Sequence, residues 1–316
     1  MSSKFTYNRF SSKWVTLALV LTVLFWLWFG LVVGVTELEI GFFLMLTFQF
    51  FFNFRSRQLA VTFSPFFIYM ILYSSLKILH LYNPFPIHIQ DIYDLEKSLF
   101  GFIYEGQRIA PCDFFENYTN TFFDLISGLF YITWVPFPVV FTLYLFYTRR
   151  RKIAFDFWTS FLITNLIGFM GYIFLPAAPP WYILEYGAEL HANVGNSPAG
   201  LIRFDQLVGI HLYQGMYANG TNAFGAMPSM HAAFPLILVY YSLKFKKKLL
   251  TLLFAVSMIS IWFAAIYSNH HYIVDVIAGI FCGILGIFLT ESLVNRKFAP
   301  NWYKRAIDYI NIPKSY

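Results

Sequence analysis

The sequence contains few charged residues and very little cysteine. Lysine, arginine, aspartate and glutamate make up only 12% of its 316 residues, about half the share that is usual in a soluble globular domain. A soluble protein with an unusually apolar core is excluded, because several nearly uncharged runs are long enough to cross a bilayer. Of the two cysteines, Cys112 falls in a polar loop and Cys282 in an apolar run. This separation argues against a structural disulfide and leaves the redox compartment open.

Apolar residues are abundant instead: 58% of the chain is hydrophobic and 22% is aromatic, including 39 phenylalanines. We expect an all-α fold, a polytopic membrane helix bundle of about 6–8 transmembrane helices. It would form a single integral membrane domain over residues 1–316, with the first apolar run retained as a signal anchor. Eight runs are candidate spans, of which the second and sixth are short: 14–35, 39–54, 59–81, 122–148, 153–175, 230–243, 249–267 and 272–292.

Lysine and arginine alternate between the segments that join these runs. If the N-terminus is cytoplasmic, eighteen of the 22 basic residues lie in inner segments, and only Lys97, Arg108 and Arg203 lie in outer ones; Lys77 falls within the third run. The positive-inside rule predicts this alternation for an even number of spans. The net charge of +6 is therefore a topology signal, and no nucleic-acid partner is expected.

The last outer segment contains two adjacent histidines in "SNHHYIVD". His271 and Asp275 are four residues apart, so a helix that begins near Tyr272 would place them on one face. The carboxylate could then orient the imidazole and leave its other nitrogen as a nucleophile or base. His270 lies about 100° around the helix from His271 and is a poorer partner for Asp275. Taken alone, the spacing is a weak signal, and an interfacial pair with only a structural role is the favoured interpretation.

A second motif, "GAMPSMHAAFP", lies in the outer segment at about 176–229 and at the start of the sixth run. Pro228 is expected in the first turn of a helix, where Ser229 and the backbone N–H groups could receive an anion. His231 stands beside this position and could protonate a leaving oxygen. A proline-capped span with an incidental histidine is the alternative.

Together the two motifs resemble the type 2 phosphatidic acid phosphatase superfamily, whose second motif is P-S-x-H and whose third is H-x-x-x-D. The resemblance implies that His271 attacks phosphorus to form a phosphohistidine, that His231 is the acid for the leaving group, and that Asp275 orients the nucleophile. It also implies a phosphatase-like catalytic core at about 122–292. The phosphatase Ser-Arg pair is replaced by Ala264 and Ala265, and the K-x6-R-P motif is absent.

Four segments in order resemble a narrower family, the inositol phosphorylceramide synthases of the fungal type and their bacterial relatives: "APPWYILEYG", "GLIRFD", "FGAMPSMHA" and "HHYIVD". This resemblance implies an enzyme that moves a phosphoinositol head group from phosphatidylinositol to ceramide or dihydroceramide and releases diacylglycerol. Arg203 and Ser229 would hold the phosphoryl oxygens, and His270 would also bind the substrate phosphate. Asp205 would bind polyol hydroxyls or pair with Arg203, and the pair is preferred. Asp124 is expected only to cap a helix. No metal or cofactor is expected.

Two other functions remain open. The same residues could serve a lipid phosphate phosphatase, in which water replaces the acceptor, although the missing motifs argue against it. A transporter or non-catalytic scaffold is the alternative of another class, but transporter sites lie near the bilayer midplane, whereas the titratable groups here gather at the outer surface. The expected location is multi-pass in a membrane, with the site on the extracytoplasmic face. The short polar tails favour a bacterial inner membrane over a Golgi membrane.

Overall fold

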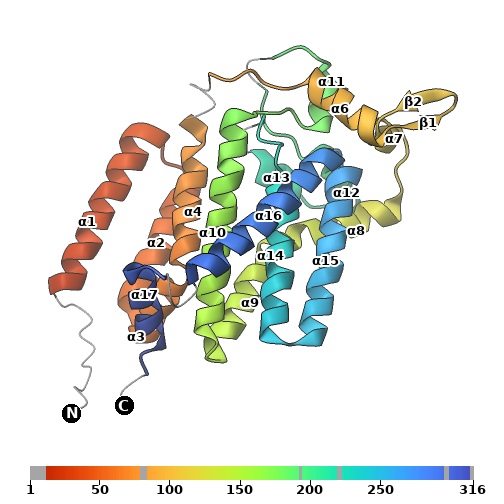
Figure 1. Cartoon of the computed structure of the whole chain (residues 1–316). Helices are drawn as coiled ribbons and strands as arrows, with labels where there is room; N and C mark the ends of the chain where they lie inside the picture. The colour runs from red at the N-terminus through yellow and green to blue at the C-terminus, as the bar shows by residue number, and fades with distance from the viewer. Residues whose placement is uncertain (1–11, 79–83, 192–193, 219–222, 295–298, 314–316) are drawn as a thin grey trace.

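The computed structural model describes residues 12–78, 84–191, 194–218, 223–294 and 299–313, and these form a helix bundle with one small hairpin (Figure 1). The expected all-α architecture is confirmed. The helices and strands are α1 (Ser12–Trp28), η1 (Phe29–Val33), α2 (Glu37–Phe52), α3 (Phe54–Thr62), α4 (Ser64–Ser75), α6 (Gln90–Phe100), β1 (Phe102–Tyr104), β2 (Gln107–Ile109), α7 (Pro111–Asn117), α8 (Thr121–Tyr131), η2 (Ile132–Trp134), α9 (Pro136–Tyr147), α10 (Arg151–Phe174), α11 (Pro180–Tyr186), η3 (Ala199–Leu201), α12 (Ile202–Val208), α13 (Leu212–Ala218), α14 (Met230–Phe245), α15 (Lys248–Tyr267), α16 (Ile273–Val294) and α17 (Asn301–Asn311).

Among the described residues, four helical stretches are long and apolar enough to cross a membrane: Trp14–Val33, Arg151–Phe174, Lys248–Tyr267 and Ile273–Val294. Two bent pairs raise the number to six, α3 with α4 at 55° and α8–η2 with α9 at 44°. Each bend precedes a proline, Pro65 or Pro136, near the start of the following helix, where the missing N–H breaks the hydrogen-bond ladder. Six is the lower end of the expected range. The other two expected spans became the shorter helices α2 and α14.

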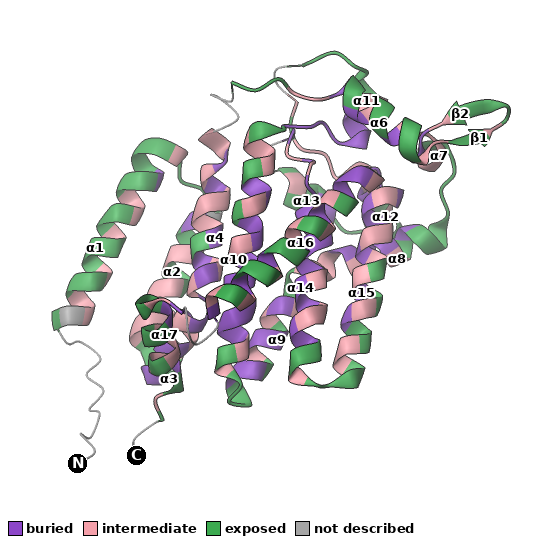
Figure 2. Cartoon of the chain, in the orientation of Figure 1, coloured by how far each residue is buried: buried purple, intermediate pink, exposed green. Residues whose placement is uncertain are grey.

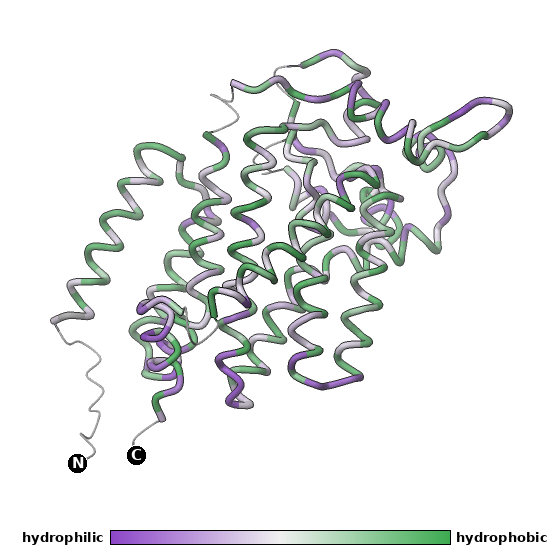
Figure 3. Tube along the Cα trace, in the orientation of Figure 1, coloured by the Kyte–Doolittle hydropathy of each residue, from purple (hydrophilic) through white to green (hydrophobic). Residues whose placement is uncertain are grey.

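Loops gather at two opposite ends of the bundle (Figure 1). The α9–α10 and α14–α15 connections, which carry Arg149, Arg150 and Lys247, lie at one end, and α6, α7 and α11 lie at the other. The tube in Figure 3 is mostly hydrophobic along the long helices α1, α15 and α16 and hydrophilic at these basic connections. This arrangement agrees with the predicted alternation of basic and non-basic segments. The basic residues Lys4, Arg9, Arg296, Lys297 and Lys314 lie outside the described residues.

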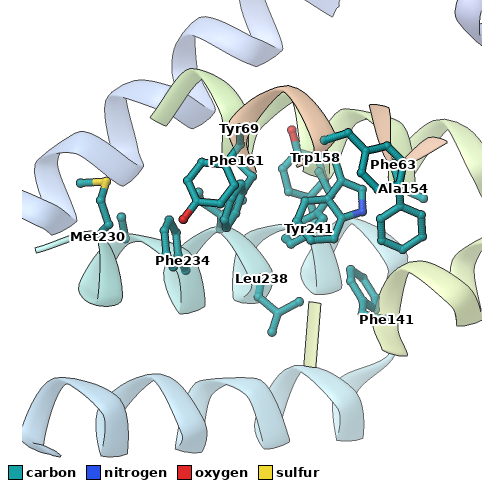
Figure 4. Close-up of a cluster of buried hydrophobic side chains, with 14 of the residues drawn as sticks. Phe63, Tyr69, Phe141, Ala154, Trp158, Phe161, Met230, Phe234, Leu238 and Tyr241 are labelled. Carbon is teal, nitrogen blue, oxygen red and sulfur yellow. The ribbon is translucent and has the colours of Figure 1, made fainter. Parts of the chain in front are cut away.

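The main core lies between α4, α9, α10 and α14 and is largely aromatic (Figure 4). Phe161 of α10 stacks on Phe234 of α14 with ring centroids 4.3 Å apart, and Tyr69 of α4 meets Phe161 edge to face at 4.9 Å. Figure 2 shows burial concentrated on α10 and α14, whereas α1 is mostly exposed. Since the exposed face of α1 is apolar, lipid is its expected surrounding.

Candidate active site

The loop Ser268–Tyr272, which we call the histidine loop, joins α15 to α16 and folds back on the end of α15. The N–H groups of His270 and His271 both donate to the carbonyl oxygen of Ala265, at 3.1 and 3.0 Å. Asn269 adopts φ = 56°, a left-handed conformation that asparagine accepts more readily than most residues. This reversal turns both imidazoles toward the bundle, where they are almost fully buried.

His271 and Asp275 lie together as their spacing predicts, although the contact between them is long. Nδ1 of His271 is 3.6 Å from Oδ2 of Asp275, beyond hydrogen-bond length. Oδ2 accepts the N–H of Tyr272 at 2.9 Å, while Nδ1 of His271 and Oδ1 of Asp275 have no other described partner. A small rotation of the ring would close the pair, and such loose geometry is common in sites without substrate.

The second motif brings His231 to the same place. Nδ1 of His231 lies 3.4 Å from Nε2 of His271, although forty positions of sequence separate them. The start of α14 is tied to α16 because the N–H of Ser229 donates to the carbonyl oxygen of Asp275 at 2.9 Å. Gly279 makes this approach possible, since a Cβ there would lie 2.0 Å from the carbonyl oxygen of Ser229.

The expected anion site at the start of α14 differs from the structure in two respects. Pro228 lies before Ser229, which is the N-cap, and so stands outside the helix. The N–H of Ser229 already donates a hydrogen bond to the carbonyl oxygen of Asp275. The hydroxyl of Ser229 is fully buried without a described partner. The prediction placed Pro228 and Ser229 too far into the helix. In the structure Ser229 links α14 to α16 through its N–H.

His270 is held as a neutral ring. Its Nε2 is 2.7 Å from the carbonyl oxygen of Pro198, so the proton lies on Nε2 and Nδ1 is an acceptor. The ring is stacked near Tyr217, at 4.8 Å, and Tyr131, at 5.7 Å. Burial, with a smaller contribution from the neighbouring His271, lowers the pKa of His270 to about 3. This histidine can therefore accept a hydrogen bond at neutral pH but carries no charge.

Arg203 does not pair with Asp205; this expectation is wrong. Nε of Arg203 forms an ion pair with Oδ1 of Asp124 at 2.6 Å, and the hydroxyl of Tyr267 donates to the same oxygen at 2.9 Å. Asp124 was expected to cap α8, but Asn120 does so by accepting the N–H of Phe122. Both residues of the pair thus anchor the 200–205 segment beside the end of α15.

Asp205 has a local role that the sequence pattern did not reveal. Its two oxygens accept the N–H groups of Tyr213, at 3.2 Å, and Gln214, at 3.0 Å. The carboxylate is buried and stabilises the start of α13, where a negative charge is favourable. Its prediction as a polyol ligand is untested, but both of its oxygens already have backbone donors.

A cavity of about 280 Å³ opens beside the three histidines. Its walls come from α4, α10, α14 and the loops between α11 and α14, and they include Tyr69, Asn165, Tyr172, Tyr217 and Trp134. The described residues that line it include no Lys, Arg, Asp or Glu, and Ser229 is not among them either. Arg203, Asp205 and Ser229 therefore lie outside its wall. The described part of the chain also contains no group of three His, Cys, Asp or Glu side chains that could hold a metal ion.

Sequence reasoning missed one further carboxylate close to the histidines. Glu96 of α6 is buried and accepts two backbone N–H groups at the start of α16. Its only signal in the sequence is an acidic side chain on the amphipathic stretch 90–100, and such a residue is usually solvent-exposed.

Two histidines that line a cavity in a membrane helix bundle, with an aspartate next to one of them, form the arrangement that the resemblance to the phosphatidic acid phosphatases predicts. The sequence profile of the PAP2 superfamily matches residues 113–289, and the chain belongs to this superfamily. The resemblance found in the sequence motifs is thereby confirmed. No solved structure matches the chain significantly.

Within this superfamily, the chain is similar to curated proteins that are named as phosphoinositol-transferring enzymes. Phosphoinositol dihydroceramide synthase of Bacteroides thetaiotaomicron is 40% identical over 83% of this chain and 86% of its own length. The inositol phosphorylceramide synthase catalytic subunit of Saccharomyces cerevisiae is 29% identical over 64% of this chain and 52% of its own length. Inositolphosphotransferase 1 of the same yeast is 30% identical over 37% of this chain and 23% of its own length.

Proposed function

We propose that this protein is an integral membrane enzyme that transfers phosphoinositol from phosphatidylinositol to the hydroxyl of ceramide or dihydroceramide, with release of diacylglycerol. The observation that carries the proposal is the 3.4 Å approach of His231 to His271 at the cavity wall. The similarity over most of its length to a phosphoinositol dihydroceramide synthase supports the choice of donor and acceptor.

The first half-reaction forms a phosphohistidine. Nε2 of His271 attacks phosphorus, the bond from phosphorus to the diacylglycerol oxygen breaks, and protonated His231 gives its proton to that oxygen. Asp275, adjacent to the other ring nitrogen of His271, stabilises the imidazolium that develops during attack. The products at this stage are diacylglycerol and an enzyme that carries the inositol phosphate group on His271.

The second half-reaction transfers the group to the acceptor. Neutral His231 takes the proton of the ceramide hydroxyl as its oxygen attacks phosphorus, and the bond from phosphorus to His271 breaks. His231 is then protonated again, and the cycle is closed without other reactants. Two in-line displacements would retain the configuration at phosphorus.

The charge of the cavity supports a phosphodiester substrate. A diester carries one negative charge, whereas a phosphate monoester carries close to two at neutral pH. The described residues that line the cavity include no lysine or arginine, so the single charge of a diester is easier to accommodate there than the nearly double charge of a monoester. A monoester of the kind that a phosphatase hydrolyses would leave more charge uncompensated in a poorly hydrated site.

The enzyme would meet its substrates at the outer surface of the membrane. The site lies at the end of the bundle opposite the basic α9–α10 and α14–α15 connections (Figure 1), and basic connections face the cytoplasm. The extracytoplasmic leaflet, in a bacterium the periplasmic side of the inner membrane, is therefore the proposed source of both lipids.

The test uses purified protein in liposomes that contain phosphatidylinositol and ceramide. Wild type should form inositol phosphorylceramide and diacylglycerol in equal amounts, and His271→Ala should lower turnover by at least about a thousandfold. His211→Ala, a change at an exposed histidine, should leave turnover unchanged. Free phosphate from phosphatidic acid, without transfer to ceramide, would favour the phosphatase. Near-normal transfer by His271→Ala would overturn the mechanism.

A further inference from the structure

The outer segment Gln90–Asn117, which comprises α6, the β1–β2 hairpin and α7, lies over the histidine loop at the site end of the bundle (Figure 1). Most of it precedes residue 113, where the match to the PAP2 superfamily begins. It nevertheless packs on the start of α16: Ile92, Ala110 and Cys112 form one buried apolar cluster with Tyr272 and Val274. A part of the chain outside the superfamily core therefore contacts the loop that carries the proposed nucleophile.

Glu96 makes the polar connection between these parts. Its Oε1 accepts the N–H of Ile273 at 3.0 Å, and its Oε2 accepts the N–H of Val274 at 3.1 Å. The side chain is only 1% exposed, and burial raises the pKa of the Glu96 carboxyl. A carboxylate is costly in such a place unless donors compensate it, and here two N–H groups of the α16 terminus do so.

Glu96 and Asp275 together hold three consecutive N–H groups. Asp275 accepts that of Tyr272, and Glu96 accepts the next two. The backbone that leads from His271 to Asp275 is therefore fixed from outside by Glu96 and from inside by Asp275. At the other end of the histidine loop, Oε2 of Glu116 accepts a hydrogen bond from the side-chain amide of Asn269 at 3.0 Å. The outer segment therefore makes hydrogen bonds at both ends of the histidine loop.

We propose that Glu96 is a positioning residue for phosphoryl transfer, which fixes the start of α16 so that Asp275 and His271 keep their mutual orientation. This inference rests on the proposed role of His271 as the nucleophile. Glu96 does not line the cavity, so its loss should affect the attack on phosphorus and leave lipid binding intact. A misplacement of about 1 Å at a reacting group can lower the rate by about a hundredfold.

The experiment compares Glu96→Ala and Glu96→Gln in the liposome assay, with the initial burst of diacylglycerol as a measure of the first half-reaction. Glu96→Ala should lower kcat and the burst rate by about a hundredfold with KM for phosphatidylinositol within about twofold of wild type. Glu96→Gln keeps the size of the side chain and one acceptor oxygen, so its kcat should be about tenfold higher than that of Glu96→Ala. If Glu96→Ala does not fold, Glu96→Gln and its burst rate decide alone.

Asp113→Asn is the matched control. Asp113 accepts hydrogen bonds from the Tyr93 hydroxyl and the Ala110 N–H, at 2.7 and 2.8 Å, and so stabilises the outer segment without contact to the histidine loop. It should lower the melting temperature while kcat stays within about twofold of wild type. An equal loss of kcat in Asp113→Asn and Glu96→Gln would show a general packing role and overturn the inference, as would wild-type kcat in both Glu96 variants. If His271→Ala is inactive in the same assay, either of these two results contradicts only the positioning role of Glu96, and the proposed function is unaffected.

Discussion

The substitution Gly279→Ala adds one methyl group, and we expect this group to push His231 away from His271. Gly279 lies on the face of α16 that meets the start of α14, and a Cβ there would stand 2.0 Å from the carbonyl oxygen of Ser229 and 3.2 Å from Cβ of Ala232. The nearest atom is backbone, so it cannot move aside by a change of rotamer. The two helices must shift apart, or the first turn of α14 must distort.

The size of the effect follows from these distances. Contacts of a Cβ below about 3 Å are essentially never tolerated, so the local separation must grow by about 1 Å. His231 follows Ser229 by two residues, and its Nδ1 is 3.4 Å from Nε2 of His271. A shift of this size at reacting groups lowers kcat by about a hundredfold, and the overpacking costs about 1–3 kcal/mol of stability.

Gly283→Ala provides a control one turn further along the same face of α16. Its nearest neighbour would be Cδ2 of Leu236 at 3.1 Å, followed by Cα of Ala233 at 3.4 Å. A flexible leucine can yield by this amount, so turnover should stay within about threefold of wild type. Both variants are assayed for inositol phosphorylceramide formation and for thermal unfolding in detergent. Equal kcat for Gly279→Ala and wild type in folded protein would refute the reasoning that the α14–α16 contact sets the geometry of the histidines.

Two further predictions concern residues around the site. Asp124→Asn and Arg203→Lys should each cost about 1–3 kcal/mol of stability, because each leaves a charge-assisted hydrogen bond unmade. The double variant should cost little more than either single variant. If the KM for phosphatidylinositol rises only in Arg203→Lys, Arg203 contacts the phosphate directly and this reasoning is wrong. His270 has a pKa of about 3 in the folded protein against about 6.5 in an unfolded chain, so the unfolded state binds the extra proton. Stability present above pH 6.5 should therefore decline toward pH 3, and thermal melts should show a shallower decline for His270→Asn.

The parts of the site that the sequence predicts are those in which local spacing determines geometry. The sequence predicted His271 beside Asp275 from their separation of four residues. In the structure His271 lies two residues before the helix that begins at Ile273, and it still lies next to Asp275 in the first turn. The meeting of His231 with His271 is not local. Only the resemblance of both motifs to one superfamily predicted it, because spacing in one motif says nothing about the position of another.

The partners of the supporting charges could not be predicted in the same way. Arg203 had a carboxylate two residues away in Asp205, but on α12 these side chains point in different directions. Its actual partner, Asp124, is 79 residues distant in the sequence. Glu96 acts on N–H groups 177 and 178 residues away. Such pairings depend on how the outer segment and the loops pack on the bundle, which apolar periodicity leaves undetermined.

The replacement of the phosphatase Ser-Arg pair can now be connected to the charge of the cavity. Ala264 and Ala265 are fully buried in a cluster with Ile261, Tyr131 and Tyr213, so a guanidinium at either position would require a rebuilt core. The carbonyl oxygen of Ala265 also receives the N–H groups of both loop histidines, so this turn still shapes the histidine loop without adding a cation. A superfamily site that keeps its two histidines and aspartate but loses a cationic clamp is suited to a phosphate with one charge. That is the charge of a phosphodiester, and a transferase between two diesters never needs to hold the dianion that a phosphatase must bind and release.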